Sequence, residues 1–147
     1  MKRYKLTTKD LTTHDGFQWE IGKWVKTSGE GKLCGAGWLH CYCDPLLAVL
    51  HNPAHADIVD PILWEVEVRG KTKKDGQLKE GWTQMRLTKQ IHLPEITSEQ
   101  RIKYAIFCAL EVCDDKDFRK WATSWLDGTD RTKKSAVAMS LASYGVA

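Results

Sequence analysis

The stretch ILWEVEVRG, residues 62–70, decides the fold class because it alternates between large apolar and charged side chains. The apolar positions are Ile62, Trp64, Val66 and Val68, and the charged positions are Glu65, Glu67 and Arg69. A period of two residues is typical of a strand that buries one face and exposes the other. The pattern therefore predicts a strand over these nine residues.

Shorter stretches of similar character lie on both sides of this strand. They predict further strands over residues 3–8, 16–27, 37–43 and 85–93. Gly22 is expected to break or bulge the second of these. The lysine-rich residues 71–82 predict a solvated loop.

Helix signals come from capping residues and from a change of period after Pro94. Asp44 and Pro45 predict the start of a short helix that Asn52-Pro53 ends. In the C-terminal part, three helices are predicted: one from a capping box at Thr97 to Cys113, one over 117–126, and one over 131–145.

Strands first and helices second predict an α+β fold, with a mostly antiparallel N-terminal sheet and about three C-terminal helices packed on it. The 147 residues match the length of one domain, so we expect a single domain over 1–147. Its strand-rich part spans 1–93 and its helical part spans 97–147.

Composition narrows the functional classes. A net charge of +3 excludes an acidic mimic of DNA and is too small to indicate nucleic-acid binding by itself. No apolar run is long enough to cross a bilayer, and the first residues lack the apolar core of a secretory signal. Five cysteines, an odd number, favour free thiols in a reducing cytoplasm.

The stretch CGAGWLHCYCDP, residues 34–45, raises the question of a metal site or a catalytic cysteine. The candidate metal ligands are Cys34, His40, Cys41, Cys43, His51 and His55. The one-residue spacing of Cys41 and Cys43 is too tight for the usual zinc knuckle, and Pro53 is expected to break the helix between the last two histidines. We therefore expect no metal and cysteines that pack as small hydrophobes.

Acid–base candidates are few. His40 and Cys41 are neighbours on a predicted strand and face opposite ways, so His40 is expected to be structural rather than a partner of that thiol. Glu65 and Glu67 share a face about 7 Å apart. They would suit acid–base work only in a cleft, and a solvated outer face is the favoured interpretation.

The motifs YK, GFQWEIGK and LCGAGWLHCYCDP follow one another in a recognisable order. Residues 4–93 thereby resemble a family of small bacteriophage and prophage proteins with the pattern Y-K, G-F-Q-Y-E-x-G-K, L-C-x-x-G-F-H. Trp19 stands where the family has Tyr, and Tyr42 stands where the family often has Cys. The resemblance implies a phage accessory protein that acts in the cytoplasm of the bacterial host. It implies no particular reaction.

A second likeness concerns G-x-L-H-x-Y at residues 37–42, a following helix with alanine, and the E-V-E-V strand. This order resembles the core of ADP-ribosyltransferase-like folds. The resemblance implies NAD as cofactor, Tyr42 at its nicotinamide end, and Glu65 or Glu67 beside the ribosyl cation, with His40 in the same cleft. The first predicted strand departs from the pattern, since it offers Arg3 but no histidine.

The sequence is compatible with three functions. The favoured one is a non-enzymatic module that binds and modulates a host bacterial protein, for example as an anti-defence inhibitor, and needs no cofactor. The excess of seven tryptophans supports it, and the candidate binding residues are Trp19, Trp24, Trp38 and Trp82. The alternatives are the NAD-dependent transferase and, less favoured, a nucleic-acid binder using Lys71, Lys73 and Lys74.

Overall fold

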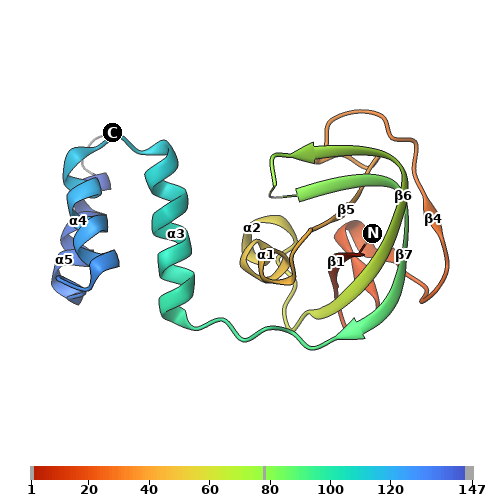
Figure 1. Ribbon diagram of the computed structural model, residues 1–147, viewed down its shortest axis with the longest axis horizontal. Helices are drawn as coiled ribbons and strands as arrows, with labels where there is room; N and C mark the ends of the chain where they lie inside the picture. Colours follow the sequence, from red (N-terminus) through yellow and green to blue (C-terminus); the bar gives the residue numbers. More distant parts are fainter. Residues whose placement is uncertain (1, 78, 145–147) are drawn as a thin grey trace. The chain divides into compact units, whose positions relative to one another are not determined.

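The computed structural model describes residues 2–77 and 79–144, with the side chains of 140–144 left out of the description. Figure 1 shows a strand-rich part followed by helices. The strands are β1 (Lys2–Thr7), β2 (Thr12–Thr13), β3 (Phe17–Gln18), β4 (Val25–Lys26), β5 (Leu39–Cys41), β6 (Ile62–Asp75) and β7 (Lys79–Ile91). The helices are the 3-10 turn His14–Gly16, α1 (Pro45–Leu50), α2 (Asn52–His55), α3 (Ser98–Val112), α4 (Lys116–Asp127) and α5 (Lys133–Tyr144).

The main sheet is antiparallel and bends round until it closes. Its strands follow the order β1-β6-β7-β4, and β5 pairs with another part of β7. Tyr4 and Tyr42 exchange two backbone hydrogen bonds of 2.9 Å, which join β1 to the chain just after β5. The strands β1, β6, β7 and β5 therefore form a ring, and the long curved strands β6 and β7 are prominent in Figure 1.

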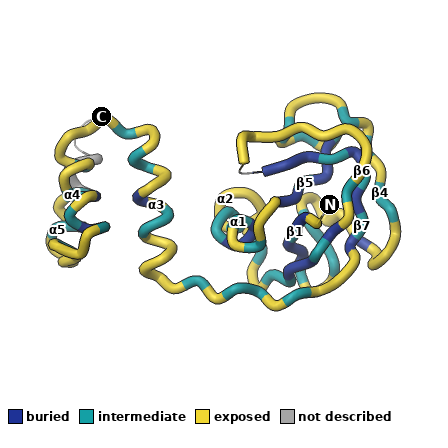
Figure 2. Tube along the Cα trace, viewed as in Figure 1, coloured by how far each residue is buried: buried dark blue, intermediate teal, exposed yellow. Residues whose placement is uncertain are grey.

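Two apolar clusters stabilise this ring from its two sides. The larger contains Trp19, Leu39, Cys41, Trp64, Val66, Met85 and Leu87. The smaller contains Leu6, Tyr42, Ala48 and Leu63, so it joins β1 and β6 to helix α1. Figure 2 shows the buried positions along β1, β6 and β7 in dark blue. The alternation of residues 62–68 is confirmed, with the addition that Leu63 on the opposite face is buried by α1.

Three sequence predictions are wrong in detail. Residues 71–82 are not a loop, because β6 continues to Asp75 and β7 begins at Lys79. Residues 16–27 form no continuous strand, since only Phe17–Gln18 and Val25–Lys26 are extended around Gly22 at φ +80°. Pro53 does not end helical structure; it occupies the first turn of α2, where its missing N–H costs nothing.

The chain divides into two compact units, Met1–Glu95 and Ile96–Ala147. In the second unit, α3 begins with the predicted capping box between Thr97 and Gln100, and α4 ends at Gly128 in the left-handed region. Ile106, Ala122 and Trp125 are the buried residues of its own apolar cluster. The α+β class, with an antiparallel sheet followed by three helices, is confirmed.

Candidate functional site

A cavity of about 620 Å³ lies in the first unit. Its wall combines β1, the segment 13–19, the segment 34–42, helices α1 and α2, and Lys79 of β7. Four aromatic side chains contribute to it: Phe17, Trp19, Trp38 and Tyr42. A volume of this size with aromatic walls and a few polar groups is typical of sites for small molecules.

Lys5 projects from β1 into this cavity. Its Nζ donates a hydrogen bond of 2.9 Å to the carbonyl oxygen of His40 and lies 5.1 Å from the ring centroid of Trp19. Burial penalises the ammonium charge and lowers the pKa of Lys5 to about 8. A lysine in this state is a marker of functional sites, and the sequence pattern of β1 did not single it out.

Lys79 supplies a second cation to the cavity wall from the start of β7. Its side chain is buried, and its Nζ donates to the Sγ of Cys34 at 3.2 Å. The same wall contains His40, whose Nε2 pairs with the carbonyl oxygen of Leu33 and whose pKa burial lowers. Two lysines thus line one cavity together with three histidines, His14, His40 and His55.

Tyr42, His51 and His55 form a stack of rings at the end of β5. The rings of His51 and His55 lie 4.6 Å apart, and the hydroxyl of Tyr42 is 2.8 Å from Nδ1 of His55. The helical turn between the two histidines continues through Pro53, contrary to the predicted break. No group of three or more His, Cys, Asp or Glu in the described part of the chain is arranged to hold a metal ion.

The cysteines of the stretch 34–45 differ in burial, so the prediction that they pack as small hydrophobes does not hold for all of them. Cys41 is buried in the larger cluster, where burial raises the pKa of its thiol to about 12, so it packs as a small hydrophobe. Cys34 and Cys43 are exposed instead. All five thiols are free.

Glu65 and Glu67 lie outside the cavity. Glu65 pairs with Lys2 at 3.3 Å and Glu67 with Arg86 at 2.6 Å, on the solvated face of the sheet. His40 and Tyr42 contribute to the cavity wall, whereas neither carboxylate does. The residues that the transferase interpretation requires in one cleft are therefore not brought together.

The four tryptophans selected as binding residues differ in exposure. Trp19 and Trp38 are only 2% and 8% exposed, so neither presents a ring to a partner surface. Trp82 is half-buried, and its Nε1 donates to Glu80 at 2.9 Å. Trp24 is also half-buried, with the guanidinium carbons of Arg69 and Arg86 at 3.8 and 4.9 Å from its ring centroid.

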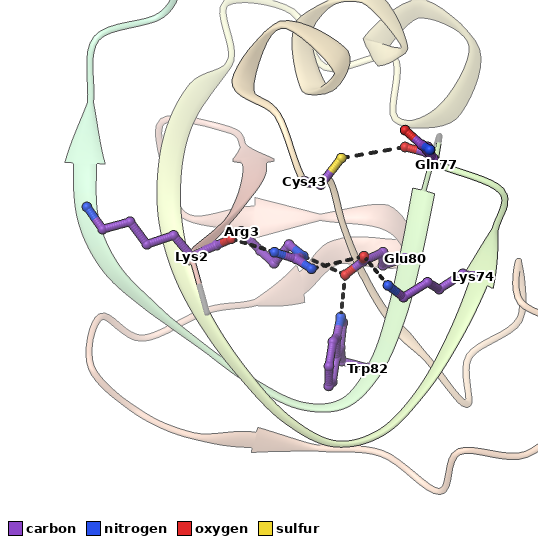
Figure 3. A network of polar contacts seen from close by, with 7 residues as sticks. All are labelled: Lys2, Arg3, Cys43, Lys74, Gln77, Glu80 and Trp82. Atoms are coloured by element: carbon purple, nitrogen blue, oxygen red, sulfur yellow. Dashed lines mark hydrogen bonds and ion pairs between the residues drawn. The ribbon is translucent and has the colours of Figure 1, made fainter.

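A buried ion pair that sequence analysis missed joins β1 to β7 (Figure 3). Two of the three guanidinium nitrogens of Arg3, Nε and Nη2, donate to the carboxylate of Glu80, at 2.5 and 3.1 Å. Lys74 and Trp82 donate to the same carboxylate. Burial alone would raise the pKa of Glu80, but the hydrogen bonds from Arg3, Trp82 and Lys74 outweigh it and lower the pKa to about 2.

The lysine run is also largely committed to internal contacts. Lys74 pairs with Glu80 at 3.0 Å, and Nζ of Lys73 donates to the carbonyl oxygen of Gly31 at 3.2 Å. The first contact joins the two strands of the β6–β7 hairpin, and the second joins the hairpin to the segment around Gly31. They offer little support for a role of the run in binding nucleic acid.

Fold and site together define an α+β protein whose first unit is a closed ring of strands with an aromatic, cation-bearing cavity. No described helix has both the length and the apolar character needed to span a membrane. The chain belongs to the family of the domain of unknown function DUF7666, which matches residues 1–99. No curated protein and no solved structure matches the chain.

Proposed function

We propose that the chain is a non-enzymatic binding module that modulates a protein of a bacterial host, acting in the host cytoplasm as a phage-type accessory protein. An inhibitor of a host defence protein is the form we favour. The likeness of residues 4–93 to small phage proteins supports the biological setting. The family match covers the same part of the chain and is neutral on function.

The observation that carries the proposal is the surface formed by Trp24, Arg69 and Arg86. Trp24 is half-buried, with two guanidinium groups against its ring. Tryptophan and arginine are the side chains most enriched among residues that dominate binding energy at protein interfaces. Glu67 and Gln84 hold the two arginines in place through hydrogen bonds of 2.6 and 2.8 Å. The surface is thus pre-organised, which lowers the entropic cost of binding.

Binding is favoured over turnover because the carboxylates of the transferase interpretation are engaged elsewhere. Glu65 and Glu67 form ion pairs on the outer face, away from His40 and Tyr42. An acid–base or cation-stabilising role requires the carboxylate within hydrogen-bond reach of a substrate in the cleft. NAD therefore has no place in the proposed function.

The test is capture from a lysate of a bacterial host with the immobilised protein, followed by reconstitution with the purified partner. We expect one stoichiometric partner whose affinity falls at least about tenfold on Trp24→Ala and Arg69→Ala. Arg101→Ala, an exposed arginine of α3, is the matched control and should bind normally. Equal binding by all three variants, or transfer of label from NAD to a lysate protein, would overturn the proposal.

A further inference from the structure

Two cations of the cavity wall, the half-buried Lys5 and the buried Lys79, have no carboxylate partner within residues 2–77 and 79–144, which the structure describes. Nζ of Lys5 meets the carbonyl oxygen of His40 and the ring of Trp19, and Nζ of Lys79 meets the thiol of Cys34. Among the described residues, neither lysine takes part in an ion pair. Taking an ammonium group out of water is costly unless a charge of opposite sign compensates it.

Arg3, on the same strand as Lys5, shows how a carboxylate can compensate a cation in this part of the fold. Arg3 lies two residues before Lys5 on β1, so both side chains project to the same side. Arg3 is buried with the carboxylate of Glu80 bound to it at 2.5 Å. Lys5 is half-buried, and its ammonium group contacts the carbonyl oxygen of His40 and the ring of Trp19, both of which are neutral. An apolar residue at position 5 would pack against Trp19 without that penalty.

The cavity wall itself supplies almost no negative charge. Asp15 is the only carboxylate among the described residues that line it. Its side chain is 88% exposed and pairs with Nδ1 of His14 at 2.9 Å, so it points to solvent at the rim. The charge of the two lysines is therefore left uncompensated inside the cavity.

A third polar group in the wall also lacks a partner. Thr27 lines the cavity, and its Oγ1 is buried with no hydrogen-bond partner in the part of the chain that the structure describes. A buried hydroxyl without a partner loses the free energy of one hydrogen bond, and native structures contain few of them. Because that oxygen is closed off even from water, a ligand in the cavity does not reach it, and the two lysines carry the argument.

We propose that this cavity binds a small organic anion that carries an aromatic ring, with its charged group held by Lys5 and Lys79. Phe17, Trp38 and Tyr42 supply the apolar wall for the ring. Charge and aromatic surface in one cavity of about 620 Å³ point to this ligand class together.

The test uses two fluorescent dyes of nearly the same shape: anilinonaphthalene sulfonate, which is anionic, and phenylnaphthylamine, which lacks the sulfonate. We expect the wild-type chain to bind the sulfonate dye at least about tenfold more tightly than the neutral dye, because an ammonium–anion hydrogen bond is worth more than a neutral contact. Equal affinity for the two dyes would overturn the proposal.

Variants then assign the preference to the cavity. Lys5→Met and Lys79→Met should each reduce the preference for the sulfonate dye about tenfold and leave the affinity for the neutral dye unchanged. Lys5→Arg should retain the preference. Lys89→Met removes an exposed lysine on β7 and serves as the control. A preference that survives both cavity substitutions would place the dye elsewhere and refute the site.

A third variant keeps the test decisive if a lysine substitution impairs folding. Lys79→Gln keeps a polar side chain and removes only the charge, and we expect a loss of about fivefold in affinity for the sulfonate dye alone. The site is also separable from the proposed partner surface, because Trp24 does not line the cavity. Trp24→Ala should leave dye binding intact. Unchanged affinity for the sulfonate dye in both Lys5→Met and Lys79→Gln would rule out the anion site without affecting the proposed partner surface.

Discussion

At the scale of single residues, Glu80 has the largest expected effect on stability. Its carboxylate compensates the buried guanidinium of Arg3 and also accepts hydrogen bonds from Lys74 and Trp82. Removing one partner of a buried pair leaves the other charge uncompensated. Glu80→Gln should therefore lower the free energy of unfolding by about 3 kcal/mol in urea titrations. Glu67→Gln, at an exposed pair with Arg86, is the control and should cost less than about 1 kcal/mol.

The same carboxylate predicts a pH dependence. The pKa of Glu80 is about 2 in the folded chain against 4.5 for the free side chain, so the unfolded chain binds more protons between these values. Its contribution to stability is complete above pH 4.5 and is lost as the pH falls toward 2. Acid titrations of wild type and Glu80→Gln should converge in this window. Parallel curves would contradict the assignment.

Lys5 gives a pH dependence of the same direction at alkaline pH, but here the charged form is the destabilising one. Burial lowers its pKa from 10.5 to about 8, so the unfolded chain binds more protons than the folded chain between those values. Stability due to Lys5 therefore rises with pH across this window. Lys5→Met should be more stable than wild type at pH 7 by on the order of 1–2 kcal/mol, with the difference shrinking toward pH 10.5.

The buried thiol of Cys41, whose pKa burial raises from 9.0 to about 12, is present in both proteins, so the difference between them at each pH reports chiefly on Lys5. A less stable Lys5→Met would show that its contacts with His40 and Trp19 outweigh the cost of burial. If Lys5→Met stabilises the chain and weakens anion binding, Lys5 shows the trade-off between stability and function that is expected of a functional residue.

At the scale of elements, Gly81 explains how β5 and β7 approach one another. It pairs with His40, and a Cβ at this position would lie 2.6 Å from Cδ1 of Leu33 and 2.9 Å from Cβ of Trp38. Gly81→Ala should destabilise the chain by about 2–3 kcal/mol in thermal or urea unfolding, because Leu33 and the cavity residue Trp38 must both move.

Gly22→Ala is a useful comparison for that prediction. At Gly22 the backbone has φ +80° but a Cβ would meet nothing within 4 Å, so only backbone strain of about 1 kcal/mol is expected. A larger loss at Gly22 than at Gly81 would argue against the close approach of the two strands.

The strands that sequence predicted well are those with one buried and one solvated face. The apolar side of residues 62–68 fills the ring, and the alternation shows it. Residues 71–75 were missed because both of their faces are solvated, so no apolar period marks them. Their extended form depends on the ladder to β7, including the pairs of Thr72 with Trp82 and Lys74 with Glu80.

At the scale of the whole molecule, the two units each have their own apolar clusters. The buried residues of the first unit's clusters come from segments before residue 90, and those of the second lie between Ile106 and Trp125. A chain of residues 1–99 should therefore fold cooperatively, with the dispersed amide spectrum of the strand ring and the dye preference of the full chain. An unfolded fragment would instead favour the single domain, with its helices packed on the sheet, that the sequence predicts.

The candidate site was predictable only in part. His40, Tyr42, Trp19 and Trp38 attracted notice through residue type and local spacing, and all four line the cavity. Lys5 and Lys79 did not, since a lysine in a strand pattern ordinarily indicates a solvated face. Their place in the cavity wall results from tertiary contacts. Strands β1 and β7 both meet the segment 34–42, which is distant in sequence from both lysines.

By itself, the sequence determined the order of elements, the helix caps at Asp44, Thr97 and Gly128, and the α+β class, because these depend on neighbours within a few residues. The tertiary structure alone decided that the strands close through Tyr4 and Tyr42, that Arg3 meets Glu80, and that Lys5 has no such partner. Closure and charge compensation join residues 38 to 77 positions apart, and no local period in the chain encodes such distances.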